Sequence, residues 1–439
     1  MIRSRSTLAA ASVALAMALS ACSGDSGAGG GGGGGGTTCD GPLTFWTWVP
    51  NIQSAVDLYE QTHPGTDVQV VNVGQGDEHY TQLRTVLTAG TGAPDAVQME
   101  FKNIPAFVLT ESLVDLREHG AAELENQFLP SAWRQVLVGE GIYGIPQDTG
   151  PMVMMYRKDI FDSLGIPVPT TWDEYVEAGR RIHASDPNRF IGHIGPDDAG
   201  GIQSLLWQAG SRPFQRQGET AITIDFSDEG AARWAKTFNT LVSEQLVEPV
   251  PGFTDEWYRG LTEGRYATWV AGAWAPTFLQ TVIPQTEGLW RVAPMPNYGE
   301  PVTAENGGSS VAVTTQSECP AAAADFAKWL NGDPAAAKLL NEVSLLYPAT
   351  SGLVESQEWL NAPMPFLGGQ LANQVYVESS RQVAEGWQYT PFQDYTESVF
   401  PDTVGQAMVG RTDLQAGLNA WGERLRSYAT EQGFQVQGS

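Results

Sequence analysis

The chain has 439 residues, of which 42% are hydrophobic, and its 50 acidic and 24 basic side chains give a formal net charge of -26 at pH 7. This charge argues against nucleic acid or an anionic membrane surface as a partner, since both need a basic footprint. Its simplest interpretation is a solvated acidic surface. The length exceeds what one hydrophobic core usually serves, so we expect two domains or lobes.

The first 21 residues have the pattern of a secretory signal peptide. Arg3 and Arg5 precede an apolar run from Thr7 to Leu19, which is too short to span a bilayer as a mature helix. Residues 19–22, LSAC, resemble the bacterial lipobox, in which the cysteine becomes the new N-terminus and receives lipid. We therefore expect Cys22 to be lipidated, with an ordinary cleavage site as the alternative.

Residues 22–38 combine this cysteine with a Gly-rich tether that contains eight consecutive glycines. A coil of about 16 such residues has a root-mean-square reach of roughly 20 to 24 Å. The remaining cysteines are Cys39 and Cys319. In an oxidising compartment this pair is expected to form a disulfide, and a free buried thiol at either position is the alternative.

The body opens with alternating strand and helix patterns. An apolar run at 43–50 predicts a strand, and the spacing at 51–65 predicts a helix. A second strand at 66–74 and a helix followed by a strand within 77–100 complete the signature of an open α/β sheet. Further helices are expected at the following places: a segment capped by Thr171 with Glu174, residues 229–247, residues 320–346 and most of the last 60 residues.

Catalytic and cofactor motifs are mostly absent. Five single histidines are scattered without a zinc motif, and the chain lacks a phosphate loop. The stretch at 307–311 lacks the second glycine of a nucleophile elbow, and the stretch at 74–79 lacks the third glycine of a dinucleotide fingerprint. We expect no cofactor and no metal. A carboxylate pair for glycoside hydrolysis remains possible in so acidic a chain.

Tryptophan in loops and at strand ends is the most informative feature. Core packing is the better interpretation for most of them, but Trp48 and Trp274 lie among Pro, Gly and Asn rather than in a periodic pattern. Flat aromatic rings cover the C–H faces of a pyranose, and carboxylates accept hydrogen bonds from its hydroxyls. These residue types predict sugar recognition without being unique to it.

Several stretches together resemble the extracellular solute-binding proteins of ABC importers, in particular the large carbohydrate-binding family that includes maltose-binding protein. The matching stretches run in family order from residue 43 to about 425, and they are LTFWTW, LYEQTHPG, LRTVLTAGTGAPDAVQME, YGIPQDTGPMVMMYRKDIFDSLGIPVPTTWDEY, GRYATWVAGAWAP, ENGGSSVAV and AADFAKWL. The YGIP to TTWDEY block is the most specific. Arg157 stands where the family usually has asparagine.

The resemblance implies an α/β fold of the two-lobed, type II periplasmic-binding-protein kind, with a hinge and a central cleft. The N-terminal lobe would comprise 39–150 and 309–350, and the C-terminal lobe 151–308 and 351–439. The chain would cross between the lobes near 149–153 and 303–308. Closure around a bound sugar would be a hinge motion in which no bond is broken.

The same resemblance implies the ligand-binding residues. Trp48 and Asn51 fall on the first ligand loop, Glu100 on the second, and Asp148 at the first crossover. Trp274 matches the family's stacking tryptophan. The other expected site residues are Asp77, Asp198, Gly307, Gly308, Arg381 and Trp387. At Gly307 and Gly308 the absence of a Cβ would let backbone N–H groups approach the ligand.

The sequence therefore predicts a lipid-anchored receptor that binds a carbohydrate and delivers it to an ABC permease, and not an enzyme. We expect a monomer on the outer face of the cytoplasmic membrane of a Gram-positive, high-GC bacterium. Two alternatives remain open: a receptor for a non-sugar solute such as a polyamine or peptide, and a secreted glycosidase.

Overall fold

The computed structural model describes residue 39, residues 41–218 and residues 220–437. The expected signal peptide, Cys22 and the tether lie outside the described residues. The described residues form one compact unit. Within the described ranges, no helix has both the length and the apolar character needed to cross a bilayer.

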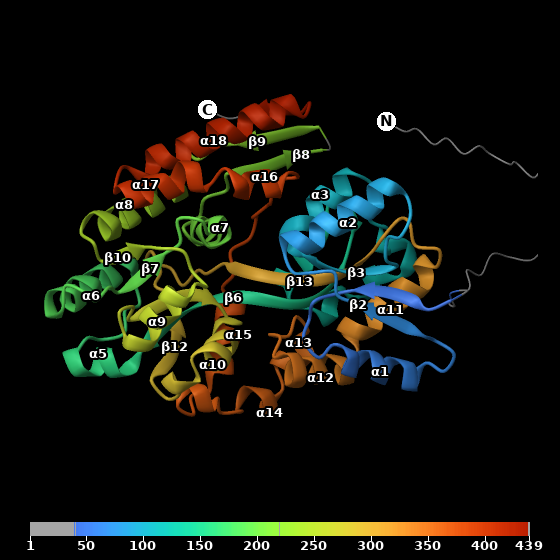
Figure 1. Cartoon of the computed structure of the whole chain (residues 1–439), viewed down its shortest axis with the longest axis horizontal. Helices are drawn as coiled ribbons and strands as arrows, with labels where there is room; N and C mark the ends of the chain where they lie inside the picture. The colour runs from blue at the N-terminus through green and yellow to red at the C-terminus, as the bar shows by residue number, and fades with distance from the viewer. Residues whose placement is uncertain (1–38, 40, 219, 438–439) are drawn as a thin grey trace, which may run out of the picture. The chain divides into compact units, whose positions relative to one another are not determined.

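The strands alternate with helices through most of the chain (Figure 1). The strands are β1 (Leu43–Trp46), β2 (Val68–Val71), β3 (Ala96–Glu100), β4 (Leu137–Val138), β5 (Gly141–Ile142), β6 (Ile145–Arg157), β7 (Gly192–Ile194), β8 (Phe214–Gln217), β9 (Ala221–Ile224), β10 (Val247–Pro249), β11 (Thr268–Gly272), β12 (Trp290–Pro294), β13 (Glu305–Val313) and β14 (Gln435–Gln437).

The helices include several short ones near the C-terminus. The α-helices are α1 (Gln53–Thr62), α2 (Asp77–Ala89), α3 (Ile104–Leu109), α4 (Pro130–Gln135), α5 (Lys158–Leu164), α6 (Trp172–Ser185), α7 (Ala199–Gln208), α8 (Glu229–Ser243), α9 (Asp255–Glu263), α10 (Ala275–Val282), α11 (Pro320–Gly332), α12 (Pro334–Ser344), α13 (Ser351–Val354), α14 (Gln357–Leu360), α15 (Ala372–Arg381), α16 (Gln393–Ser398), α17 (Gln406–Gly410) and α18 (Leu414–Glu431). Short 3₁₀ or π turns are η1 (Phe101–Asn103), η2 (Leu116–His119), η3 (Ala121–Gln127), η4 (Pro284–Thr286), η5 (Pro365–Leu367) and η6 (Pro401–Gly405).

The main sheet contains seven strands in the order β11-β6-β13-β3-β1-β2, with β12 also paired to β6. β1 pairs in parallel with β2 and β3, as the βαβ pattern of the sequence predicts, whereas β13 is antiparallel to both β3 and β6. The first half of β6 pairs with β13, and its second half, from Met152 to Arg157, pairs with β11 and β12. The long strands β6 and β13 lie side by side and link the two groups of strands (Figure 1).

Three clusters of buried apolar side chains form the core. The first draws on residues 43–145 and 311–349, and it includes Phe45, Leu83 and Phe326. The second draws mainly on residues 152–247 and 383–429, and the third mainly on residues 257–292 and 347–377. Thus segments far apart in the sequence share each core, and the chain passes between cores along β6 and β13.

A buried carboxylate lies where β6 and β13 meet. The Glu305 side chain is fully buried, and it accepts hydrogen bonds from Thr149 Oγ1 at 2.6 Å and from the Gly150 backbone N–H at 2.8 Å. Burial raises the pKa of Glu305, and these two donors oppose the rise. This pairing ties the two strands together at the point where the sequence predicts the interlobe crossovers.

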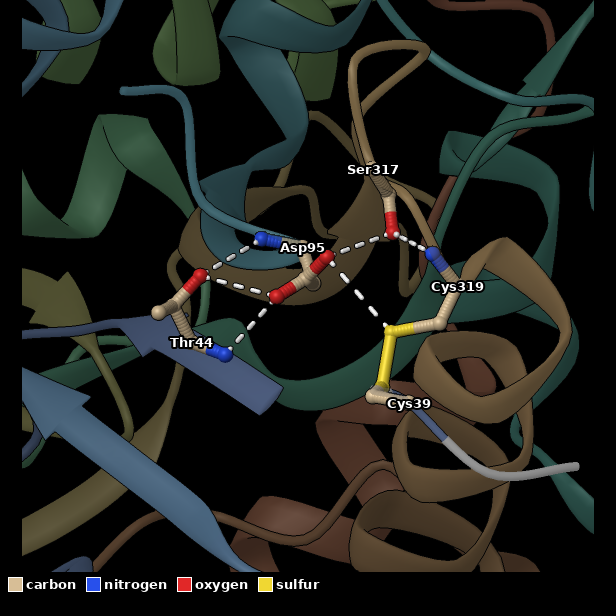
Figure 2. The surroundings of a disulfide bond; sticks show 5 residues. All are labelled: Cys39, Thr44, Asp95, Ser317 and Cys319. Atoms are coloured by element: carbon tan, nitrogen blue, oxygen red, sulfur yellow. Dashed lines mark hydrogen bonds between the residues drawn. A yellow bond between two sulfur atoms is a disulfide. The ribbon is translucent and has the colours of Figure 1, made fainter. Parts of the chain in front are cut away.

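Cys39 and Cys319 are joined by a disulfide that spans 280 positions of sequence, with the two Cα atoms 5.2 Å apart. Figure 2 shows that Asp95 lies beside this bond and accepts from three groups on two segments. Thr44 donates to Asp95 Oδ2 from its backbone N–H and its hydroxyl, at 2.8 and 2.9 Å, and Ser317 Oγ donates to Oδ1 at 2.7 Å. The start of the first core is therefore fixed to the beginning of α11 by both covalent and polar contacts.

The structure corrects one element predicted from sequence. The helix expected at 320–346 is two helices, because Pro334 lacks the N–H that a continuous helix needs. Asp333 caps the second helix, and its Oδ1 accepts from the backbone N–H groups of Ala335 and Ala336 at 2.8 and 3.2 Å.

Candidate ligand-binding cleft

A cavity of about 210 Å³ lies between the C-terminal end of β3, the start of β13, the N-terminus of α7 and helix α16. Four carboxylates line it, and they are Glu100, Asp197, Asp198 and Glu397. Glu100 is the last residue of β3, whereas Glu397 comes from α16, almost 300 residues later in the chain. The topology thus gathers acceptor groups that are dispersed in the sequence.

Lys102 is the cationic side chain among the described residues that line this cavity. Its Nζ donates to both oxygens of Glu397, each at 3.1 Å. Burial opposes the charge on Lys102, but the carboxylates of Glu100 and Glu397 outweigh burial and raise its pKa. For Glu100 the order is reversed: burial dominates and raises the pKa, and Lys102 only reduces the rise.

The N-terminus of α7 forms one wall. Asp198 caps this helix, and its Oδ1 accepts from the Gly201 N–H at 2.8 Å. Gly200, Gly201 and Ser204 also line the cavity, so the first turns of α7 present small residues to it. Asp198 itself is exposed and lines the cavity.

Two glycines of β13, Gly307 and Gly308, form another part of the cavity wall. Gly307 and Gly308 have φ angles of +87° and +99°, in a region that favours glycine. A Cβ added at Gly308 would lie 2.6 Å from the Phe101 ring, and one at Gly307 would lie 3.3 Å from Trp274 Nε1. Larger residues would therefore fill the space between β13 and its neighbours.

Trp274 borders the cavity without lining it. Its Nε1 donates to the Asn306 carbonyl at 2.8 Å, and Asn306 lines the cavity. The half-buried ring continues into exposed Phe253 and Phe278, whose ring centroids lie 6.2 and 5.5 Å from it. This aromatic group forms an apolar extension next to the polar cavity, and the sequence analysis did not include the two phenylalanines.

Asp148 also lies next to the cavity, but it is engaged with β13. Its Oδ1 accepts from the Ser309 N–H at 2.8 Å and from Ser309 Oγ at 2.5 Å. Burial raises the pKa of Asp148 to about 6, and the Ser309 hydrogen bonds limit that rise. Of the described residues, none donates a hydrogen bond to Oδ2.

Trp48 and Asn51 lie farther from the cavity. The Trp48 ring contacts His79 and Tyr80 edge to face, with centroids 4.7 and 6.0 Å away, and Tyr80 OH accepts from the Glu100 N–H at 2.8 Å. Asn51 Nδ2 donates to the Val343 carbonyl at 2.8 Å. Trp48 therefore reaches the cavity wall only through Tyr80, and the Asn51 side chain connects its loop to α12 by a hydrogen bond.

The other expected residues are not brought to this cavity. Asp77 is exposed at the start of α2, and Arg381 is exposed at the end of α15. Trp387 stacks on Trp207 with centroids 5.5 Å apart and lines a different groove of about 1160 Å³. The structure thus gathers Glu100, Asp198, Gly307 and Gly308 in one cavity, and their roles in binding stay predictions.

Sequence reasoning missed Lys102, Gln203, Tyr389 and Glu397, all of which line the cavity. Tyr389 and Glu397 come from the C-terminal part of the chain, where no motif marks them. Asp197 and Asp198 did have a local signal, because PDDAGG before an apolar helix has the pattern of an N-cap. In the described part of the chain, no group of three or more His, Cys, Asp or Glu side chains could hold a metal ion.

The family model of bacterial extracellular solute-binding proteins matches residues 47–337. Since this match covers more than half of the chain, the protein belongs to that family, whose members are extracellular binding proteins rather than enzymes.

Individual relatives carry names that refer to sugars. The chain is 25% identical over 297 residues to the arabinooligosaccharide-binding protein of Halalkalibacterium halodurans, which covers 65% of this chain and 66% of that protein, just under two thirds of its length. It is 26% identical over 370 residues to the lactose-binding protein of Rhizobium radiobacter, covering 78% of this chain and 83% of that one.

Among solved structures, the chain is similar to the ABC transporter associated binding protein of B. animalis subsp. lactis Bl-04 in complex with beta-1,6-galactobiose. The identity is 32%, the TM-score is 0.79, and the match covers 90% of this chain and 99% of that chain. The two-lobed α/β fold that the sequence predicts is therefore confirmed.

Proposed function

We propose that the protein is the sugar-binding receptor of an ABC importer, anchored to the membrane by lipid on Cys22. The cavity carries the proposal: a space of about 210 Å³ whose wall combines four carboxylates with Lys102 and Gln203. Carboxylates accept from sugar hydroxyls, and lysine and amide groups donate to them. The names of the relatives, which refer to arabino-oligosaccharide, lactose and galactobiose, support the same substrate class.

The proposed receptor works by closure and not by chemistry. Its N-terminal lobe comprises 39–150 and 309–350, and its C-terminal lobe comprises 151–308 and 351–439. Two ion pairs then cross the cleft, Lys102 with Glu397 and Arg84 with Asp394. The hinge is the pair of strands at Glu305. Binding a ligand between the lobes favours the closed state by the difference in its affinity for the two states.

A polyamine is the second candidate ligand. The observation that favours it is the excess of negative charge, four carboxylates against one lysine at the cavity wall. A linear cation would pair with those carboxylates, whereas a neutral sugar would use them as hydrogen-bond acceptors.

Calorimetric titration of the lipid-free protein, residues 36–439, tests the ligand class. The panel is β-1,6-galactobiose, lactose, arabino-oligosaccharides and spermidine, and the bound compound is recovered and analysed afterwards. The proposal requires that a sugar binds and is recovered intact. Binding of spermidine without any sugar would favour the second candidate, and recovery of hydrolysed sugar would indicate a glycosidase.

A labelling experiment tests the anchor separately. Cells that produce the full chain are grown with labelled palmitate, and the protein is compared with a Cys22→Ser variant. The proposal requires that the label enters the wild-type protein and not the variant. Label in neither protein would contradict lipid anchoring but would not affect the ligand proposal.

A further inference from the structure

One buried amide nitrogen in the wall of the cavity has no hydrogen-bond partner among the described residues. Gln203 lies on α7 with 1% of its surface exposed, and it lines the cavity. Its Nε2 is buried, and no described residue accepts a hydrogen bond from it. A buried donor without a partner is costly, because it has lost its hydrogen bonds to water without replacement.

The orientation of this amide is fixed by a chain of hydrogen bonds that begins at Glu397. In its ion pair with Lys102, the Glu397 carboxylate accepts hydrogen bonds, so the group of Gln393 that faces it must be the NH₂. Gln393 Nε2 donates to Glu397 Oε1 at 3.1 Å and to Gln203 Oε1 at 2.9 Å. Thr390 Oγ1 donates to the other end of Gln393, its Oε1, at 3.2 Å.

Gln203 must therefore present its oxygen to Gln393. Its NH₂ is then the last group in this series of hydrogen bonds and has no acceptor in the part of the protein that the structure describes. Turning either amide over would place two acceptors, or two donors, against each other. The accepting oxygens of Glu397 thus fix the orientation of the Gln393 amide. Gln393 in turn fixes which atom of Gln203 remains for a ligand.

The free donor restricts the ligand. Glu100, Asp198 and Glu397 need a ligand that donates hydrogen bonds, whereas Gln203 needs a ligand that accepts one. A hydroxyl group does both with a single oxygen. A protonated amine of a polyamine donates only, so it would leave the Gln203 donor without a partner.

We propose that Gln203 is a specificity-determining residue that donates a hydrogen bond to a ligand hydroxyl, and that it selects sugars against polyamines. The inference rests on the proposed function, because it concerns the same cavity. Gln393 and Glu397 act through Gln203 and are positioning residues for its amide.

The test is calorimetric titration of the lipid-free protein with the sugar of the panel above that binds the wild type most tightly, and with spermidine. Gln203→Leu removes the donor and Gln203→Glu replaces it by an acceptor of the same shape. Gln406→Glu makes the same chemical change at an exposed residue of α17 that does not line the cavity, and it serves as the matched control. Ligand-free melting temperatures show whether each variant folds.

We expect Gln203→Leu to weaken sugar binding by roughly tenfold or more, since a hydroxyl oxygen is left unpaired. Gln203→Glu should also weaken sugar binding and should strengthen spermidine binding, whereas Gln406→Glu should change neither. If Gln203→Leu does not fold, Gln203→Glu decides the question.

A folded variant at position 203 that binds the sugar within twofold of the wild type would overturn the inference while leaving the proposed function intact. If the wild type binds no sugar at all, the proposed function fails and the inference fails with it. Unchanged spermidine binding by a folded Gln203→Glu variant would refute the selection against polyamines.

Discussion

Removing the Cys39–Cys319 disulfide should destabilise the protein without changing its fold. The double variant Cys39→Ser, Cys319→Ser leaves no unpaired thiol in the described residues. Asp95 would still join β1 to the segment before α11 through Thr44 and Ser317 (Figure 2). The folded structure around Asp95 should therefore persist. The loss of stability should arise mainly from the greater conformational freedom of the unfolded chain.

The size of the effect follows from the length of the closed loop. The bond connects positions 280 residues apart, so it restricts most of the unfolded body. Loop entropy for this length corresponds to about 5.6 kcal/mol, and removal of native disulfides typically costs about 2 to 5 kcal/mol. Since unfolding of about 400 residues has an entropy near 0.8 kcal/mol per degree, the melting temperature should fall by about 2 to 6 °C.

Differential scanning calorimetry of the lipid-free protein measures this shift. The wild type with and without reductant provides a second comparison, because reduction should reproduce the effect of the double substitution. A melting temperature within 1 °C of the wild type in both comparisons would refute the reasoning and would show that the bond does not constrain the unfolded chain.

Three further predictions concern the cleft. Trp274→Ala should weaken sugar binding by about 2 kcal/mol, roughly thirtyfold, as loss of an aromatic anchor in a binding site does. Trp329→Ala removes a partly buried ring that packs against the first core, and it should leave the affinity unchanged in the same titration. Lys102→Met should weaken sugar binding by about fivefold, because it leaves Glu397 without its ion-pair partner. Arg84→Met should change the affinity less than about twofold, since the pair of Arg84 with Asp394 is more exposed than that of Lys102 with Glu397. Equal effects would contradict this account. Burial raises the pKa of Asp148 to about 6, so its charge costs stability above that pH and the cost disappears as the pH falls toward the unfolded value near 4. Asp148→Asn should therefore raise the free energy of unfolding by about 1 to 2 kcal/mol at pH 8 and by less at pH 5, and an equal gain at both pH values in thermal melts would show that charge is not the cause.

The sequence predicted most of the fold because its local patterns agree with the tertiary structure. The βαβ alternation at 43–100 becomes the parallel strands β1, β2 and β3, and Thr171 with Glu174 forms the expected capping box of α6. β14 was missed because three exposed or half-buried residues, QVQ, give no apolar period, and only pairing with β9 makes them a strand.

The candidate site was predicted in part. Glu100, Gly307 and Gly308 were expected at the site from the family resemblance, and all three line the cavity, Glu100 as the last residue of β3 and the two glycines within β13. Gln203 and Glu397 could not be placed, because one lies within an apolar helix and the other in a short helix far along the chain. Their meeting at Gln393 depends on the packing of α7 against α16, which no local pattern reports.

The most direct test of the central claim is titration of the lipid-free protein with β-1,6-galactobiose, lactose, arabino-oligosaccharides and spermidine, followed by recovery of the bound compound. A ligand at a hundredfold excess over its Kd stabilises the folded state by about 2.7 kcal/mol, so thermal melts provide an independent readout. A receptor for sugars predicts that at least one saccharide binds and is recovered intact. Binding of spermidine alone, or recovery of a cleaved saccharide, would contradict it.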